Sequence, residues 1–528
     1  MALLIEGFAA ERGDRPALID EAGTTTWAQL DERVTRLVHA LRARGLTVGD
    51  TLAVMSPNRR ELFEVHLAAT HGGWVVVPVN WHWSAAELAY VLGDSGSKAL
   101  VVDPRYAAVA AAAKADPQTS GVSTWLVYDP VGLAAIGGAG AEGLDRYEAA
   151  IAAAESGPIE DPSMGGPMFY TSGTTGFPKG VRSTLSTTGV DPSVMQLITA
   201  SFTTMLGLDP DGVAYLNGPA YHSAQWVFST FPLIQGSTVV MRHAFDPAEA
   251  LRLIDAHGVT STHLVPTQMV RLLRLPDDVR GSFDGSSLKV VYHGAAPCPP
   301  EVKAQMLDWW GPVVTEYYGG TEAGFLTILD AESWRAKPTS VGRPIDSVEV
   351  MIADDDGNEV SVGTRGQIWS RSRLGADFHY HGDEEKTRSA HRDGGWGTLG
   401  DIGYLDDDGD LHLSDRKIDM IISGGVNIYP AEIEGALISH PRVADAAVFG
   451  VPDEEMGESV MAVVQLFDGS DGDDDLVAVL QDHVRERIAG YKVPRRIEFS
   501  ADLPRTPTGK LLKRLLRDPH WEDTGRSI

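Results

Sequence analysis

The chain has 528 residues, a formal net charge of −29 and a pI of about 4.9. A protein this acidic repels phosphate backbones, so we expect no nucleic-acid partner. The single cysteine, Cys298, excludes an internal disulfide and is typical of a reducing compartment, which favours a cytoplasmic location. We predict neither a signal peptide nor a transmembrane anchor, because no uninterrupted apolar run is long enough to span a bilayer and Glu6 interrupts the first one.

Helical and strand patterns alternate through the first 160 residues. Apolar strand patterns occupy 52–55, 74–79 and 99–102, and helical patterns occupy 26–44, 62–72 and 85–92. Strands separated by helices predict a parallel, doubly wound sheet.

The middle of the chain continues this pattern, with strands predicted over 260–265, 288–292 and 312–316. The last two run into loops that contain glycine, at 293–297 and 317–322. Ligands of open α/β sheets lie beyond the carboxyl ends of the strands. We therefore expect both loops to line one crevice together with the glycine-rich stretch 170–180.

The pattern changes after about residue 413. Strands are predicted over 444–449, 459–466 and 496–499, and an apolar stripe every fourth residue predicts a helix over 476–488. The expected fold is therefore α/β. A large domain, 1–414, has doubly wound, mostly parallel sheets, and a small α+β domain follows over 415–528.

The stretch 170–180 reads Tyr-Thr-Ser-Gly-Thr-Thr-Gly-Phe-Pro-Lys-Gly and follows a predicted buried strand. Its glycines allow backbone N–H groups to face a ligand, its hydroxyls add donors, and Lys179 adds a positive charge, which together suit a polyphosphate. It is not a Walker A loop, because Pro178 and Gly180 flank the lysine. The alternative is an ordinary surface loop.

This stretch resembles the signature of the acyl-CoA and aryl-CoA synthetases, adenylation domains and luciferases, the adenylate-forming superfamily. The resemblance implies that the stretch binds the phosphates of ATP and that Thr171 also acts in catalysis. These residues are Thr171, Ser172, Gly173, Thr174, Thr175, Gly176 and Lys179.

Residues 318–322, Tyr-Gly-Gly-Thr-Glu, resemble the second signature of this family. The resemblance implies that Tyr318 stacks on adenine, that Thr321 binds the α-phosphate and that Glu322 binds Mg²⁺, an ion that prefers carboxylate oxygen. The alternative is a turn with an exposed glutamate. The same resemblance assigns further nucleotide contacts to Glu316, Tyr317 and Gly319, and to the adenine-side segment Gly294, Ala295 and Ala296.

Two histidines allow either a functional or a structural interpretation. His222 lies in a segment that resembles the border of the family's acyl pocket, where it would act as a gate; a core histidine is an equally good interpretation. His293 and Cys298 lack the surroundings of a thiol enzyme, so we interpret both as structural.

The remaining family motifs lie toward the C-terminus. Gly400-Asp401 resembles the ribose-binding motif, although Leu399 replaces its usual threonine, and the alternative is a turn aspartate. Residues 415–434 are similar to the family's junction between its large and small domains. There the resemblance assigns ribose or phosphate binding to Arg416 and a loop facing the pantetheine of CoA to Ser423, Gly424 and Gly425, with the stiff Ile418 at the pivot. Lys510 matches the adenylation lysine of the terminal motif, carried by a small domain that rotates between steps.

The resemblance implies an AMP-forming acyl-CoA ligase that uses ATP, Mg²⁺ and coenzyme A. The apolar residues Trp226, Phe228, Val265 and Met269 favour an apolar acid: fatty, steroid-like, terpenoid or aromatic. Alternatives are an enzyme that stops at acyl-AMP or passes it to another thiol, a luciferase-like oxidoreductase, and a non-catalytic nucleotide-binding protein. The oligomeric state stays open, with a homodimer among the options.

Overall fold

The computed structural model of the chain describes residues 4–129, 143–171, 178–184, 186, 188–416, 419–423, 426–453, 456–505 and 511–521. The chain forms two compact units, each assembled from several segments. Unit 1 comprises Met1–Leu264, Leu275–Tyr292 and Ala376–Ser389, and unit 2 comprises Val265–Arg274, His293–Gly375 and Ala390–Ile528. The boundary expected between residues 414 and 415 stays a prediction.

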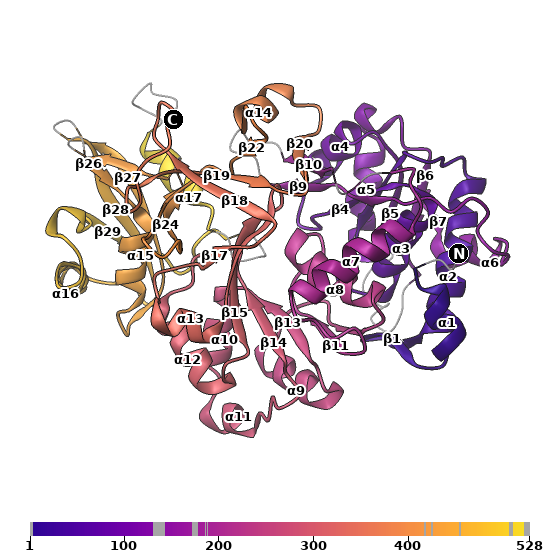
Figure 1. Cartoon of the computed structure of the whole chain (residues 1–528), viewed down its shortest axis with the longest axis horizontal. Coiled ribbons are helices and arrows are strands. Elements are labelled where there is room, and N and C mark those ends of the chain that lie inside the picture. Colours follow the sequence, from indigo (N-terminus) through magenta and orange to yellow (C-terminus); the bar gives the residue numbers. More distant parts are fainter. Residues whose placement is uncertain are drawn as a thin grey trace. The chain divides into compact units, whose positions relative to one another are not determined.

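Two sheets of parallel strands form the centre of unit 1 (Figure 1). The first has the order β7 (Asp145–Arg146), β6 (Thr124–Val127), β5 (Ser97–Val102), β3 (Thr51–Met55), β4 (Val75–Val79) and β8 (Gly166–Pro167), and all of its pairs are parallel. The second has the order β13 (Ser261–Leu264), β11 (Val213–Leu216), β12 (Thr238–Met241), β1 (Pro16–Asp20) and β2 (Gly23–Thr26), with only the last pair antiparallel.

Helices cover both faces of the first sheet. Alternate residues of β3 enter two separate cores: Leu52 and Val54 pack in one, and Ala53 and Met55 in the other. The first core holds the apolar faces of α2 (Trp27–Ala43) and α3 (Arg60–Gly72), and the second those of α4 (Ala85–Asp94) and α5 (Ala107–Lys114). This is the doubly wound arrangement that the alternating pattern predicts.

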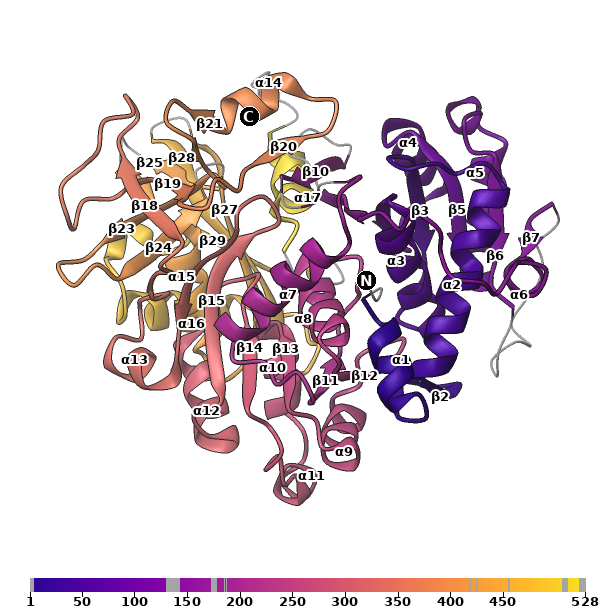
Figure 2. The ribbon, with the colours of Figure 1, turned by 45° about the vertical axis from the view of Figure 1, so that its right-hand side comes forward.

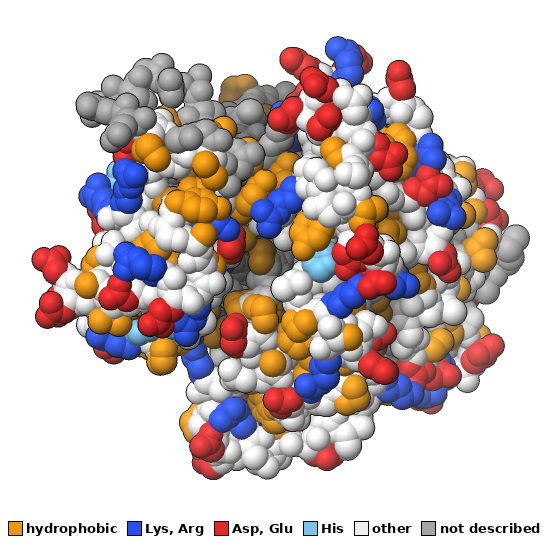
Figure 3. All heavy atoms as spheres, turned by 60° about the vertical axis from the view of Figure 1, so that its left-hand side comes forward, with side chains coloured by type: hydrophobic (Ala, Val, Ile, Leu, Met, Phe, Trp, Pro, Cys, Tyr) orange, Lys and Arg blue, Asp and Glu red, His pale blue; other side chains and the backbone are white. Residues whose placement is uncertain are grey.

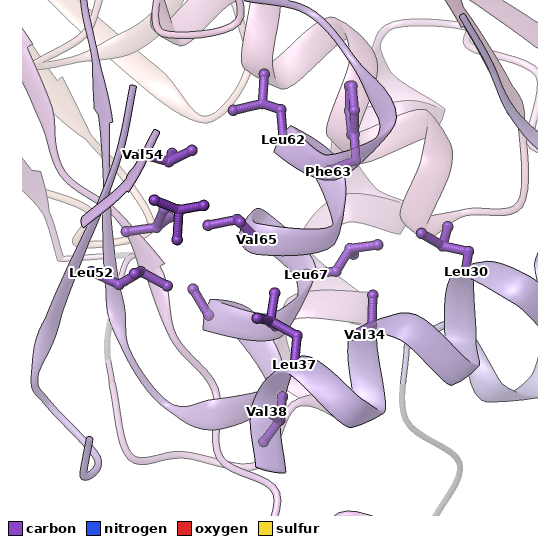
Figure 4. Close-up of a cluster of buried hydrophobic side chains, with 14 of the residues drawn as sticks. Leu30, Val34, Leu37, Val38, Leu52, Val54, Leu62, Phe63, Val65 and Leu67 are labelled. Atoms are coloured by element: carbon purple, nitrogen blue, oxygen red, sulfur yellow. The ribbon is translucent and has the colours of Figure 1, made fainter. Parts of the chain in front are cut away.

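Helix α2 shows how the sequence produces this packing. Thr26 and Gln29 form a reciprocal capping box at its start, which satisfies two backbone N–H groups. Leu30, Val34, Leu37 and Val38 then recur on one face and point toward α3 and β3 (Figure 4). All of these side chains are buried.

Unit 1 contains further helices. They are α1 (Glu6–Arg12), α6 (Tyr147–Ala152), α7 (Ser193–Met205), α8 (Ser223–Ile234), α9 (Pro247–His257), α11 (Asp277–Ser282) and α14 (Glu384–Ser389). A small antiparallel sheet, β20 (Phe378–Tyr380), β10 (Lys179–Ser183) and β9 (Phe169–Thr171), completes the unit.

Antiparallel pairing dominates unit 2. Strand β14 (Val290–His293) ends at His293, where the second segment of unit 2 begins. Strands β15 (Val314–Gly320), β16 (Gly324–Leu329) and β17 (Arg343–Pro344) follow and are antiparallel neighbours. A second sheet contains β18 (Val348–Ala353), β19 (Gly366–Ser372), β21 (His391–Arg392), β22 (Trp396–Gly397), β23 (Asp401–Leu405) and β24 (Leu411–Arg416) (Figure 2). This part of unit 2 also contains the helices α10 (Pro266–Leu273), α12 (Pro300–Trp310) and α13 (Ala331–Ala336).

The C-terminal part of unit 2 is the expected α+β fold. Its sheet has the order β26 (Val426–Ile428), β25 (Ile421–Ser423), β28 (Gly457–Leu466) and β27 (Val443–Asp453), with β29 (Arg496–Phe499) parallel to β28. Helices α15 (Pro430–Ile438) and α16 (Asp474–Arg485) pack in the core of this sheet, and α17 (Lys513–Arg517) follows.

One predicted boundary is wrong. The sequence predicts a strand over 312–316 followed by a loop, but β15 runs from Val314 to Gly320 and includes most of the second signature. Its backbone continues as strand because β16 pairs with it in antiparallel register, from Glu316 opposite Leu329 to Gly320 opposite Gly324. A partner strand distant from the local pattern thus decides the end of the element.

Candidate nucleotide site

The glycine-rich stretch of unit 1 forms a β-hairpin. Strands β9 and β10 pair so that Thr171 lies opposite Lys179. The predicted phosphate ligands Ser172, Gly173, Thr174, Thr175 and Gly176 lie outside the described residues. The structure therefore places the first hydroxyl and the lysine of the signature side by side on adjacent strands.

A network of contacts fixes this hairpin within unit 1. The Tyr170 hydroxyl donates to Asp94 Oδ2 at 2.5 Å, and the His381 backbone N–H donates to the Gly180 carbonyl at 2.8 Å. A Cβ at Gly180 would lie 3.1–3.2 Å from Met168, Tyr170 and His381, so a side chain there would require these neighbours to shift. Burial and the bond to Asp94 raise the pKa of Tyr170, so this hydroxyl stays a donor.

Lys179 does not extend freely into solvent. Its ammonium group forms an ion pair with Asp383, and both side chains are partly exposed. Asp383 lies just beyond β20, which pairs with β10 in the register Val181 opposite Tyr380. A residue two hundred positions along the chain is thus brought to the phosphate signature.

His222 is held in a rigid bend before α8. Asn58 ties this bend to the sheet: its amide donates to the Gly218 carbonyl at 2.9 Å, and its carbonyl oxygen accepts from the Ala220 N–H at 3.1 Å. The half-buried His222 ring lies against Tyr221, with ring centroids 4.3 Å apart. This position is compatible with either interpretation of His222, so its role as a gate stays a prediction.

The apolar residues favoured for the acid side pack in the cores of their own units. Trp226 contacts Phe169 and Phe231 edge to face, and its indole N–H donates to His66 Nδ1 at 3.1 Å. Burial lowers the pKa of His66 to about 3, so the ring is neutral and can accept this bond. Phe228 stacks on His263 in the same unit.

The adenine-side segment of unit 2 is strained. Ala295 has φ +66°, one of only two described non-glycine residues with a positive φ. A Cβ on the preceding Gly294 would lie 2.7 Å from the Tyr317 ring, so only glycine permits this approach. Strain of this kind persists where the surroundings enforce it and is frequent at ligand sites. Ala295 itself is exposed, whereas Tyr317 packs on Phe325 below it.

The second signature brings adenine-side and ribose-side residues together. The Tyr318 hydroxyl donates to Asp401 Oδ2 at 2.7 Å. Asp401 begins β23, directly opposite Arg416 on β24. A Cβ on Gly319 would meet the Gly324 carbonyl oxygen at 1.9 Å, so glycine is required at this position. Three residues that the family resemblance links to one nucleoside are therefore neighbours in unit 2.

Thr321 and Glu322 form the turn between β15 and β16, where both are half-buried. A carboxylate such as that of Glu322 is the hard oxygen donor that Mg²⁺ requires, and Mg²⁺ commonly takes only one or two protein carboxylates. The assignment of Glu322 to Mg²⁺ stays a prediction.

Glu316 points to a buried cation instead of toward solvent. Lys303 Nζ of α12 lies 2.6 Å from Glu316 Oε2, and His293 Nε2 lies 3.8 Å from the same oxygen. Burial raises the pKa of Glu316 and lowers that of Lys303, and their ion pair opposes both shifts. Burial also raises the pKa of the Cys298 thiol, which agrees with its interpretation as structural.

The turn before Asp401 depends on a residue that the sequence motif does not include. The buried Thr398 hydroxyl donates to the Ile368 carbonyl at 2.7 Å and accepts from the Gly400 N–H at 3.0 Å. Leu399, which replaces the family's threonine, packs in the apolar cluster with Tyr318. The signal was present in the sequence, because a threonine stands one position earlier.

The C-terminal motifs are described only in part. Ser423 is buried at the end of β25, opposite Val426 and Gly457. Gly424, Gly425, Ile418 and Lys510 lie outside the described residues. At the base of the segment that contains Lys510, Arg505 bridges to Leu511 and its guanidinium group binds both oxygens of Asp445 at 2.5–2.6 Å.

The expected absence of a nucleic-acid partner stays a prediction. Acidic and basic side chains are interspersed on the face drawn in Figure 3. Among the helices that the structure describes, none combines the length and apolar character needed to cross a bilayer. The expected cytoplasmic location stays a prediction.

Family models match most of the chain. The model described as "AMP-binding enzyme" matches residues 5–376, and the model described as "AMP-binding enzyme C-terminal domain" matches residues 432–510.

Similar proteins cover nearly the full length. A feruloyl-CoA synthase from an Amycolatopsis species is 36% identical over 92% of this chain and 92% of its own. The fatty acid–[acyl-carrier-protein] ligase ScoC from Streptomyces coeruleorubidus is 30% identical over 97% of this chain and 95% of its own. The solved structure of the amide bond synthetase McbA from Marinactinospora thermotolerans is 31% identical, with a TM-score of 0.80 over 98% of this chain and 99% of its own.

Proposed function

Because this chain belongs to the AMP-binding enzyme family, the adenylate-forming superfamily, we propose that it is an AMP-forming acyl-CoA ligase. It activates an apolar monocarboxylic acid with ATP to acyl-adenylate and pyrophosphate, and then transfers the acyl group to the thiol of coenzyme A. The observation that carries the first half is the junction of Tyr318, Asp401 and Arg416, which supports binding of one nucleoside.

The chain's residues contribute by positioning and by neutralising charge. Tyr318 presents an aromatic face and Asp401 an acceptor for ribose hydroxyls, while Thr171 and Lys179 provide a donor and a cation for phosphates. Glu322 would hold Mg²⁺, which neutralises phosphate charge when it is bound. Lys510 would supply a positive charge to the carboxylate and the α-phosphate in the adenylation step.

The candidate functions differ in which molecule accepts the acyl group in the second half-reaction. The three similar proteins are named as a CoA synthase, an acyl-carrier-protein ligase and an amide bond synthetase. We favour coenzyme A because the Ser423-Gly424-Gly425 motif of CoA ligases is intact in the sequence. An acyl-adenylate that is passed to another thiol is the second candidate, favoured by the stiff Ile418 at the expected pivot.

The test is a two-stage assay. A panel of fatty, steroid-like, terpenoid and aromatic acids is first incubated with enzyme, ATP and Mg²⁺, and pyrophosphate release is measured. Coenzyme A is then added to the best acid, with a carrier-protein thiol and an amine in parallel reactions. Acyl-CoA formation at the rate of pyrophosphate release supports the proposal, whereas acyl-adenylate that accumulates in the presence of coenzyme A contradicts it.

A further inference from the structure

Lys179 carries the only charge within the signature stretch 170–180, and it is already paired. Its partner, Asp383, belongs to the segment of residues 376–389 that joins unit 1 from far along the chain. The bond to Lys179 holds the pKa of the Asp383 carboxyl below its ordinary value. The Asp383 carboxyl is therefore ionised at neutral pH.

The two carboxylate oxygens of Asp383 bind different partners. Oδ1 accepts the backbone N–H of Lys386 at 2.9 Å, a capping bond at the start of α14, and Oδ2 binds the Lys179 ammonium group. The Asp383 carbonyl also accepts the N–H of Thr387 at 3.0 Å. The carboxylate is thus held in place from the α14 side, whereas the lysine reaches it with a flexible side chain.

The surroundings allow this pair to open. The Lys179 side chain is 20% exposed and that of Asp383 is 29% exposed, so water can replace either partner. The other nearby cation, Lys386, lies over the Tyr380 ring at 4.1 Å. A polyphosphate offers several negative oxygens, each of which can form a charge-assisted bond with the ammonium group in place of the single Asp383 oxygen.

We propose that Asp383 is the counter-ion that holds Lys179 when no phosphate is bound and competes with polyphosphate for its ammonium group. This inference rests on the proposed function, in which Lys179 binds the phosphates of ATP. Asp383 acts through Lys179 and is thus a positioning residue. It keeps the lysine beside Thr171, limits the affinity for pyrophosphate and thereby favours release of that product.

The test uses Asp383→Asn, because asparagine caps a helix as well as aspartate does and removes only the charge. Asp383→Ser, which also caps, is the second variant. The matched control is Asp209→Asn: Asp209 also binds a backbone N–H with one oxygen, that of Asp211 at 3.1 Å, and a lysine with the other, Lys289 at 2.5 Å. Binding of inorganic pyrophosphate and of ATP is measured by calorimetry, together with kcat and KM for ATP.

Asp383→Asn is expected to bind pyrophosphate about two- to fivefold more tightly and to lower KM for ATP by a similar factor. The reason is that a partly exposed ion pair no longer competes with phosphate for Lys179. The control leaves both values unchanged. In a Lys179→Met background the gain becomes smaller, because no pair remains to be broken.

Three outcomes overturn the inference. Equal gains with and without Lys179 would mean that Asp383 merely repels phosphate through space. Weaker binding by Asp383→Asn would mean that the pair persists in the complex. If the wild-type protein binds pyrophosphate and ATP but the variants do not behave as expected, only the inference about Asp383 fails. If the wild-type protein binds neither ligand, both the inference and the proposed function fail.

Discussion

The signature hairpin of unit 1 and the adenine-side wall of unit 2 are built in different ways. The hairpin, 169–183, is secured by polar contacts with partly exposed partners, chiefly Asp94 and Asp383. The wall, formed by 294–296 and β15, is secured by close packing: Gly294 and Gly319 have no space for a methyl group, and Ala295 is held at a positive φ.

This difference indicates a division of labour. Ion pairs at half-exposed positions are weak and can be exchanged for other charges, so the hairpin suits a ligand that is bound and released as an anion. A packed wall cannot adapt, so it suits a flat group of fixed shape. In the proposed function both regions bind and orient the nucleotide, and Lys510, which belongs to neither, supplies the charge placed at the transition state.

The largest expected effect therefore lies outside both regions. Lys510→Ala should reduce adenylation about a hundredfold or more, as expected when a charge placed at the transition state is lost. The loss should appear in kcat while KM for ATP changes little. The measurement is pyrophosphate release at saturating acid.

The control for this variant is the second half-reaction. Synthetic acyl-adenylate and coenzyme A should react at a rate close to that of the wild type. Equal losses in both assays would show that Lys510 acts through stability, and the separation of binding regions from chemistry would no longer hold.

Gly294→Ala tests the packed wall. The added methyl group would overlap the Tyr317 ring, and overpacking of this kind costs about 1–3 kcal/mol. We expect KM for ATP to rise about tenfold, with a smaller change in kcat. Gly281→Ala is the control, because a Cβ there meets nothing within 4 Å. An unchanged KM for ATP would mean that the wall does not contact the nucleotide.

Tyr318→Phe removes one hydrogen bond from the same wall and leaves its packing intact. Loss of the bond to Asp401 should cost about 1 kcal/mol, equivalent to a roughly fivefold rise in KM for ATP. Tyr292→Phe removes a comparable bond, to the Leu206 carbonyl, and should alter thermal stability but not KM. Equal behaviour of the two variants would contradict a nucleotide role for Tyr318.

Glu322→Gln should have the smallest effect at saturating metal. Loss of a carboxylate ligand raises the Mg²⁺ concentration required for half-maximal pyrophosphate release by several-fold, while the maximal rate is partly recovered at high Mg²⁺. The measurement is a Mg²⁺ titration at fixed ATP. A titration curve identical to that of the wild type would remove Glu322 from the proposed metal site.

Local patterns allowed much of the fold to be predicted. The strands 52–55 and 99–102 and the helix over 26–44 agree with β3, β5 and α2 within a few residues, since each has an apolar period of its own. The end of β15 was missed because its partner β16 decides it. Lys303 was missed as the partner of Glu316, since no local signal marks a buried lysine on an otherwise ordinary helix.

The sequence by itself determined the family and the order of its motifs, because those depend on residue types at fixed local spacing. Only the tertiary structure decided which residues meet: Tyr318 with Asp401, Thr398 with the turn of Gly400, and Lys179 with Asp383. These contacts join positions as much as 204 residues apart. They arise because strand pairing and core packing bring distant segments together, and no periodicity along the chain encodes that register.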